Sequence, residues 1–482
     1  MDVPACCDVT QVSELEPSLL LGLASDWPRE CWSAAALRRT SGNVEVSAML
    51  SSSDFPGDLR SHAPLALPFS ELLDAAERPP GSLRLYLAQA TLWSRDGAPA
   101  PLNRLLSLLP SCLPAPVVAS RHSSTHLWVS CHGSRSGAHY DPNVNLLVLL
   151  RGAKRVRLWP PSSTPALRPR LLGGVSSNHS SLGCAESVPA PLHATLNEGD
   201  ALLIPAGWWH QLDSAPRGAT HASGADADAL TVAVNYWWRP DGGALLAPHA
   251  CCGGGFGFAG GCAAFVARAA VEDLVAAEKA ARLDALAPAP LPLGLPAKCG
   301  EDRDAAWRAA VAGACAARLR DACARCAAGA EIGALFEGTL RSLPAHSCVD
   351  LVVRLARAHP DALSRLLLPP ALTPAAAELL TARCEAVEAD EAAAEAAGEP
   401  FLEGVGWRTT REAFEAMYAP FGDDASRVIA SVVDAKEAFA RAALAAVVAG
   451  VLGVGDASGA SAAAASAVEA CQERASDPGR GG

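Results

Sequence analysis

The chain has 482 residues, of which 50% are apolar, and a formal net charge of −12. This length is sufficient for two or more domains, and the apolar content can fill a core. The negative charge argues against a broad basic surface for duplex nucleic acid. One local basic cluster stands against this trend, made of Arg151, Arg155, Arg157, Arg168 and Arg170.

The composition also indicates in which cellular compartment the protein is expected. No run of 18 or more apolar residues has the quality of a membrane-spanning helix, and the first residues are too acidic for a secretory or organellar leader. The 16 cysteines are scattered, many of them in alanine-rich stretches, rather than spaced as a disulfide framework. We therefore expect a soluble intracellular protein of the nucleus, the cytoplasm or both.

In chain order, residues 1–125 mix short helical and strand patterns and are expected to form an α/β buttress. Residues 126–240 carry closely spaced strand patterns and should form the β core. Residues 241–300 read as a linker followed by a helix, and residues 301–455 show helical periodicity throughout. The Ala/Ser/Gly-rich stretch 456–482 is typical of a disordered tail.

The β core begins with the segment Gly137-Ala138-His139-Tyr140-Asp141. Residues i and i+2 of an extended strand point to the same side, so His139 and Asp141 project together while Tyr140 points away. Isolated pairs of this kind are common by chance. Whether His139 and Asp141 have a function therefore depends on which other polar residues the β core places near them.

The next two strand patterns predict a buried lysine. Residues 143–150 are an apolar run, and residues 153–159 alternate before a double proline. If Arg151-Gly152 is a two-residue hairpin loop, Leu149 faces Lys154, and Lys154 shares a sheet face with Leu147 and Asn145. Parity also separates Lys154 from its neighbours Arg155 and Arg157, which are expected to face solvent. The same face should carry an apolar lining of Leu147, Leu149, Val156 and Leu158.

A second histidine follows much later. Gly199-Asp200 indicates a turn, residues 201–204 a short buried strand and Pro205-Ala206-Gly207 another turn, so His210 is expected at the mouth of the returning strand. Trp208 and Trp209 are expected in the core and the pocket wall. In the strand pattern of residues 230–238, Asn235 interrupts an apolar face and requires a polar partner.

Two imidazoles, a carboxylate and a buried cation together indicate a specific chemistry. Two histidines and one carboxylate can hold one face of Fe(II) and leave the opposite positions open for a chelating co-substrate and dioxygen. A lysine in the same cavity could bind the far end of that co-substrate. Four further histidines, His132, His179, His193 and His221, fall at no ligand position and are expected in loops or on the surface.

These motifs, with the segment Ser177-Asn178-His179-Ser180-Ser181, resemble the JmjC-domain oxygenases, in particular plant and algal JmjC-only proteins and the asparaginyl hydroxylase that acts on hypoxia-inducible factor. The resemblance covers about residues 15–290. It implies a mainly β double-stranded β-helix, the jelly-roll or cupin fold, with an α/β N-terminal buttress and an all-α C-terminal extension. It further implies that His139, Asp141 and His210 bind Fe(II) and that Lys154 binds the distal carboxylate of 2-oxoglutarate. Further pocket residues implied by the resemblance are Ser136, Asn145, Asn235 and Tyr86.

The function expected from this resemblance is an Fe(II)- and 2-oxoglutarate-dependent dioxygenase that uses dioxygen to hydroxylate a protein side chain. Three alternatives stay open: hydroxylation of a modified tRNA nucleoside, demethylation of N-methyl-lysine in histones or other proteins, and a cupin scaffold that binds without turnover. The arginine cluster favours tRNA, whereas the net charge opposes it. Ala88 stands where some family members have a polar residue near the substrate, so the substrate does not transfer. The family also makes a homodimer plausible.

Overall fold

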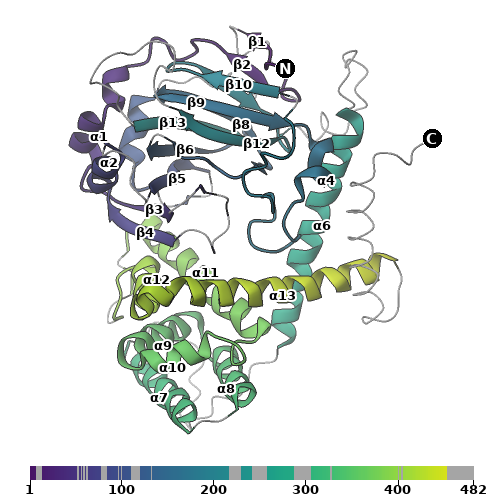
Figure 1. Ribbon diagram of the computed structural model, residues 1–482. Helices are drawn as coiled ribbons and strands as arrows, with labels where there is room; N and C mark the ends of the chain where they lie inside the picture. Colours follow the sequence, from purple (N-terminus) through teal and green to yellow (C-terminus); the bar gives the residue numbers. More distant parts are fainter. Residues whose placement is uncertain are drawn as a thin grey trace. The chain divides into compact units, whose positions relative to one another are not determined.

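The computed structural model describes residues 1–6, 13–51, 54–55, 57, 60, 63–77, 84–95, 97–98, 100–109, 120–131, 133–190, 192–215, 230–240, 258–286, 305–325, 328–399, 401–402 and 405–452 (Figure 1). These residues fall into two compact units. The first contains the described residues up to 170 and from 176 to 270, and the second contains residues 171–175 and those from 271 onward.

Two β-sheets make up most of the first unit (Figure 1). The larger has nine strands in the spatial order β1 (Ala5–Cys6), β2 (Ser18–Leu20), β11 (Ala201–Ile204), β8 (Val144–Arg151), β13 (Leu230–Trp238), β6 (His122–Cys131), β5 (Arg84–Ser94), β3 (Glu45–Ser51) and β4 (Ala63–Pro68). The smaller has the order β10 (Leu192–Leu196), β9 (Ala153–Trp159), β12 (Trp209–Ala215) and β7 (His139–Tyr140). Apart from the parallel pair β1–β2, neighbouring strands are antiparallel. The predicted double-stranded β-helix is confirmed.

Successive side chains of a strand point to opposite faces of the sheet, and so they contribute to two separate apolar clusters. Leu147 and Leu149 of β8 pack in one apolar cluster with Val156 and Leu158 of β9, which fills the space between the two sheets. The intervening residues of β8, such as Leu146, belong to a second cluster on the outer face of the large sheet. Helices α1 (Ala34–Ser41) and α2 (Phe69–Glu77) cover that outer face, which explains why β8 is buried on both sides (Figure 1).

The predicted hairpin between the strands on either side of Gly152 is wrong. β8 pairs with β11 and β13, whereas β9 pairs with β10 and β12, so the chain passes from one sheet to the other at this point. Gly152 has a φ of +86°, and a Cβ there would lie 2.9 Å from Thr231 Oγ1. The turn therefore requires glycine both for its backbone angle and for space. Lys154 still faces Leu147 across the interior, because each sheet directs one face inward.

Short helical segments complete the first unit: η2 (Arg29–Trp32), η3 (Asn103–Leu108), η4 (Pro161–Ser163) and α4 (Thr164–Leu167). The helix expected near residues 263–286 is α6 (Phe258–Ala285), whose first half belongs to this unit. Among the described helices, none is long and apolar enough to cross a membrane.

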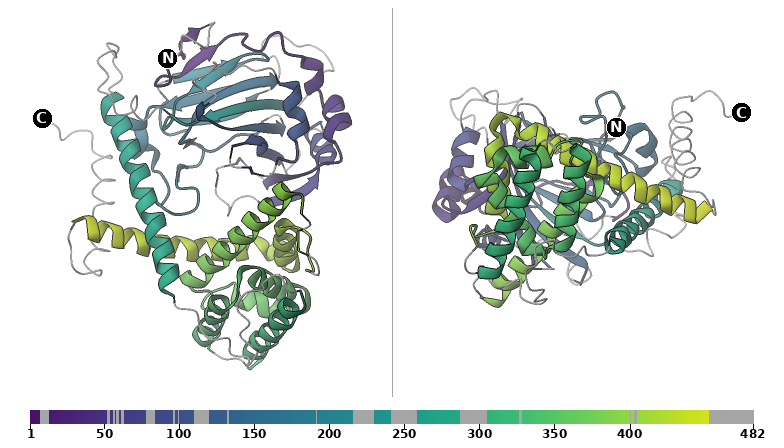
Figure 2. Two further views of the ribbon diagram at one scale, coloured as in Figure 1. Left: turned by 180° about the vertical axis from the view of Figure 1, so that it is seen from behind. Right: turned by 90° about the horizontal axis from the view of Figure 1, so that it is seen from below.

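The second unit is helical, as predicted for the C-terminal region (Figure 2). After the second half of α6 it contains α7 (Ala305–Ala324), α8 (Gly329–Ser342), α9 (Ala345–Ala358), α10 (Pro360–Leu366), α11 (Pro374–Ala397), α12 (Thr410–Tyr418), η5 (Ala419–Asp424) and α13 (Ala425–Leu452). Phe336, Leu351 and Trp407 lie in a single apolar core shared by these helices. The predicted tail 456–482 lies outside the described residues.

Because the chain passes from one sheet to the other at Gly152, we predict that a side chain at this position lowers the free energy of unfolding. Gly152→Ala combines an unfavourable φ, which costs about 1–2 kcal/mol for a residue with a Cβ, with overlap that adds about 1–3 kcal/mol. Gly97→Ala is the matched control, because its φ is +78° and nothing lies within 4 Å of its Cβ position. Urea unfolding followed by tryptophan fluorescence should give the larger shift for Gly152→Ala, and equal shifts would contradict this account of the crossing.

Candidate metal and co-substrate site

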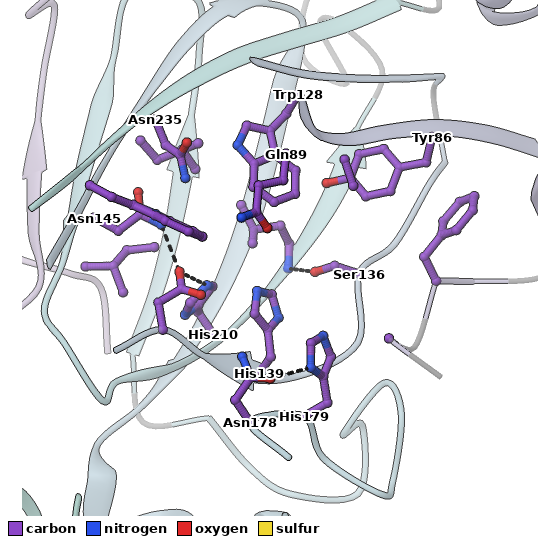
Figure 3. Close-up of a pocket in the computed structure, with 18 of the residues that line it drawn as sticks. Tyr86, Gln89, Trp128, Ser136, His139, Asn145, Asn178, His179, His210 and Asn235 are labelled. Atoms are coloured by element: carbon purple, nitrogen blue, oxygen red, sulfur yellow. Dashed lines mark hydrogen bonds and ion pairs between the residues drawn. The ribbon is translucent and has the colours of Figure 1, made fainter. Parts of the chain in front are cut away.

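Three potential metal ligands converge at the end of the smaller sheet (Figure 3). One ligand atom from each of His139, Asp141 and His210 lies within 4.8 Å of the other two. β7 pairs with β12 so that His139 is opposite His210 and Tyr140 is opposite Trp209. The predicted alternation around Tyr140 therefore holds, and the structure brings the predicted triad together.

The hydrogen bonds of the two imidazoles determine where their lone pairs lie. Nδ1 of His139 is 2.8 Å from the Gly137 carbonyl oxygen, and Nδ1 of His210 is 3.0 Å from that of Trp208. A carbonyl only accepts, so each Nδ1 must carry the proton and donate it. In the neutral ring this leaves an unprotonated Nε2, which is the form that binds metals.

The environment of His210 favours that neutral form. Burial and the neighbouring His139 lower the pKa of His210 to about 4, although the Asp141 carboxylate opposes the shift. Nε2 of His210 lies 3.6 Å from Oδ2 of Asp141, and at neutral pH no proton lies between them. Two lone pairs and a carboxylate that face one another are all acceptors, and a cation satisfies them together. The residues present therefore fit a divalent metal.

Lys154 lies deeper between the sheets and is only 3% exposed. It is opposite Ser214 in the β9–β12 ladder, and its Nζ is 3.4 Å from Ser214 Oγ, which in turn is 2.8 Å from Ser130 Oγ. Burial lowers the pKa of Lys154 to about 8, with the Asp213 carboxylate opposing the shift. Four residues of strand, about 13 Å, separate His210 from Ser214.

A single cavity of about 400 Å³ contains the triad and Lys154. Its walls also include Ser136, Tyr86 and Asn235, so every site residue predicted from the sequence lines it. Of the predicted apolar lining, Leu147 reaches the cavity, while Leu149, Val156 and Leu158 lie in the cluster behind it. Trp208 and Trp209 are core residues, and neither reaches the wall.

The four secondary site residues occupy distinct positions. Asn145 Nδ2 donates to Asp141 Oδ2 at 3.2 Å and so orients that carboxylate. Among the described residues, the buried side-chain oxygens of Asn145 and Asn235 have no hydrogen-bond partner, as expected for acceptors that face a polar ligand.

Ser136 and Tyr86 place hydroxyl groups in the cavity. Oγ of Ser136 accepts the backbone N–H of Leu212 at 3.0 Å, which leaves its own hydrogen for a ligand. Tyr86 packs against Phe55 and Trp128, with ring centroids 5.2 and 6.0 Å away. Burial raises the pKa of Tyr86, so its hydroxyl stays protonated and can donate.

His179 lies in an irregular stretch, as expected, but it also lines the cavity, which the sequence did not indicate. Its ring stacks on that of His139, with centroids 4.9 Å apart and planes 11° from parallel, and it lines the cavity. It comes from the irregular stretch after β9, where no periodic pattern shows which residues face the site. His193 is exposed on β10, as expected, and His132 and His221 lie outside the described residues. Gln89, Asn178 and Trp128 are further wall residues that spacing alone did not reveal.

Comparison with known proteins agrees with the fold that carries this site. The cupin-like domain family matches residues 9–243. The lysine-specific demethylase JMJ31 of Arabidopsis thaliana is 34% identical over 244 residues, which cover 41% of this chain and 44% of the relative. Residues 9–243 thus match a cupin-like domain, and the chain is similar there to a protein named as a JmjC-type demethylase.

Two further relatives match over shorter stretches. The HSPB1-associated protein 1 of Homo sapiens is 33% identical over 18% of this chain and 20% of its own. The tRNA wybutosine-synthesizing protein 4 of Aspergillus oryzae is 38% identical over 15% of this chain and 7% of its own. The matches thus span less than half the length of these relatives. JmjC family members include Fe(II)- and 2-oxoglutarate-dependent oxygenases.

The triad predicts metal binding that depends on each of its members. His139→Ala, Asp141→Ala or His210→Ala should each weaken Co(II) binding by at least about tenfold, because each removes a ligand. Titration of the visible Co(II) absorption measures this without any substrate. His193→Ala, a histidine exposed on the same sheet, is the control and should bind Co(II) like the unaltered protein. Undiminished binding by the triad variants would refute the ligand assignment.

Lys154 predicts the pH dependence of co-substrate binding. Its ammonium group is protonated below pH 8 and loses its proton as the pH rises through that value. The dissociation constant for 2-oxoglutarate, measured by calorimetry with Mn(II), should therefore stay level below pH 8 and rise by up to about tenfold per pH unit above it. Lys154→Ala should weaken binding by about 2–5 kcal/mol, whereas Arg155→Ala, its exposed neighbour, should not. A dissociation constant that does not change from pH 7 to 9.5 would contradict the binding of 2-oxoglutarate by Lys154.

Proposed function

We propose that the JmjC domain is an Fe(II)- and 2-oxoglutarate-dependent oxygenase that hydroxylates a protein side chain. The observation that carries the proposal is the convergence of His139, Asp141 and His210 in one cavity with the buried ammonium of Lys154. A structural metal site is usually closed by four protein ligands. Three ligands on one side, with a cation set apart from them, suit a metal that shares its remaining positions with an anionic co-substrate.

The chain's own residues would divide the work between binding and orientation. His139, Asp141 and His210 would hold Fe(II), and the Asn145 amide would keep the Asp141 carboxylate in place. Lys154, with the hydroxyls of Ser136 and Tyr86, would bind the distal carboxylate of 2-oxoglutarate. When bound, Fe(II), 2-oxoglutarate and dioxygen supply the oxidising chemistry, in which one oxygen atom enters a substrate C–H bond as 2-oxoglutarate becomes succinate and carbon dioxide.

Burial explains why one lysine suffices for the co-substrate. An ammonium and a carboxylate attract more strongly when water is excluded, and the apolar cluster of Leu149, Val156 and Leu158 lies directly behind this part of the cavity. The same apolar surroundings lower the pKa of Lys154. An anionic partner offsets that cost, since it favours the charged form of the lysine.

The charge of the cavity wall supports a neutral substrate side chain over a methylated ammonium. Among the described residues of the wall, Asp141 is the one carboxylate, and it belongs to the metal ligands. The outer wall has amide, imidazole and aromatic groups, including Gln89, His179 and Trp128. A cationic side chain would find little compensation for its desolvation there, whereas a neutral polar side chain can form hydrogen bonds.

Demethylation of N-methyl-lysine is the second candidate, because the relative from Arabidopsis thaliana is named as a lysine-specific demethylase. Hydroxylation of a tRNA nucleoside has the support of the match to a tRNA wybutosine-synthesizing protein and of the exposed Arg155. The net charge of −12 weighs against a phosphate backbone as partner.

Turnover and product mass distinguish these functions. With Fe(II), the unaltered protein should convert 2-oxoglutarate to succinate, and His210→Ala should not. When cell proteins are incubated with either form, the unaltered protein should add the mass of one oxygen atom to particular peptides. Loss of methyl groups from lysines would instead favour the demethylase, and stimulation of succinate release by tRNA alone would favour the nucleoside hydroxylase. Absence of succinate under all conditions would leave only a binding scaffold.

A further inference from the structure

An arginine on helix α6 contacts the outer side of the metal-ligand strand. Nε of Arg268 donates to the Tyr140 hydroxyl at 2.8 Å, and its Nη2 donates to the carbonyl oxygens of Ser177 at 2.9 Å and Arg170 at 3.4 Å. Arg268, Tyr140 and both carbonyls belong to the first compact unit. Arg268 nevertheless lies beyond residues 9–243, the part matched by the cupin-like family.

Tyr140 is the residue between two of the proposed ligands. Its side chain points away from the cavity and packs edge-on against Trp209, with ring centroids 4.9 Å apart and planes 70° apart. It is only 5% exposed and belongs to a small outer cluster that also contains Trp159 and Leu167. Because successive residues of a strand share one backbone, the position of Tyr140 on the outside sets the positions of His139 and Asp141 on the inside.

The strand itself is poorly anchored by the sheet. β7 has two residues and is the edge strand beside β12. On its other side it pairs with the segment around His179, where the Tyr140 N–H donates to the Asn178 carbonyl and Asn178 Nδ2 donates to the Tyr140 carbonyl, at 3.1 and 2.8 Å. Ser177, whose carbonyl Arg268 binds, directly precedes Asn178. Arg268 therefore holds both the strand and the segment that borders it.

We propose that Arg268 is a positioning residue of the metal centre, which completes the site from outside residues 9–243 by fixing the outer side of the His139–Asp141 segment. This inference rests on the proposed function. A guanidinium suits the role because it is rigid, planar and permanently charged, and it presents several donors in fixed directions. A lysine in its place would present its donors from a single nitrogen, without the fixed spread of the guanidinium nitrogens.

Metal affinity in the full-length protein provides the test. Arg268→Ala should weaken Co(II) binding about tenfold, the range seen when outer partners of metal ligands are lost, and Arg268→Lys should recover part of that loss. Arg282→Ala is the matched control: Arg282 is on the same helix, where it donates to Glu278 one turn away. Arg282→Ala should leave Co(II) binding unchanged.

A double-mutant cycle separates positioning from a general contribution to stability. If Arg268 acts through Tyr140, Arg268→Ala should weaken Co(II) binding much less in a Tyr140→Phe background than in the unaltered protein. Lower unfolding stability with unchanged Co(II) affinity, or strictly additive losses, would overturn the inference while leaving the metal site intact. If Arg268→Ala does not fold, Arg268→Lys and Tyr140→Phe carry the same comparison. Failure of the unaltered protein to bind Co(II) would instead count against the proposed function.

Discussion

The candidate site depends on one electrostatic constraint: two imidazoles and a carboxylate are held facing one another. Such a set of acceptors is unfavourable where it is shielded from water, as Asp141 and His210 are. The two carbonyls that accept from Nδ1 of His139 and His210 fix the rings in this orientation, and the Asn145 amide fixes the carboxylate. A divalent cation would satisfy these acceptors together, which is why the metal is central to our interpretation.

The rest of the site follows from how two sheets share an interior. β12 carries His210 and Ser214 on the same face, and Ser214 lies opposite Lys154 of β9. One sheet therefore presents a metal position at one end and an ammonium group at the other. The larger sheet contributes Asn145 and Asn235 from the opposite wall, along with Ser130, which extends the hydrogen bonds behind Lys154. The residues that would bind and orient a metal and its co-substrate, and that exclude water from them, thus belong to the inner faces of the two sheets.

Much of this could be predicted from the sequence because side-chain alternation is a local property. The burial of Lys154, the exposure of Arg155 and the opposite directions of His139 and Tyr140 all follow from a period of two residues. Strand pairing is not local, and the predicted hairpin at Gly152 failed for that reason. The inward direction of Lys154 was nevertheless correct, because the strands on both sides of the crossing face one interior.

Residues outside periodic elements were harder to place. His179 lies in an irregular stretch, and its stack on His139 depends on how that stretch folds back along β7. Arg268 stands in an alanine-rich helical segment that resembles many others in this chain, and its contacts come from residues about a hundred positions away. The substrate could not be predicted either, because its recognition depends on cavity-wall residues such as Gln89 and His179, which only the tertiary structure brings together.

The most direct test of the central claim is an anaerobic titration with Fe(II) and 2-oxoglutarate, followed by visible absorption. A 2-oxoacid that chelates Fe(II) through its carboxylate and keto oxygens gives a charge-transfer band that neither component gives alone. Our account predicts this band for the unaltered protein, its loss in Asp141→Ala, and a need for higher 2-oxoglutarate concentrations in Lys154→Ala. Absence of the band in the unaltered protein at saturating Fe(II) and 2-oxoglutarate would contradict the account.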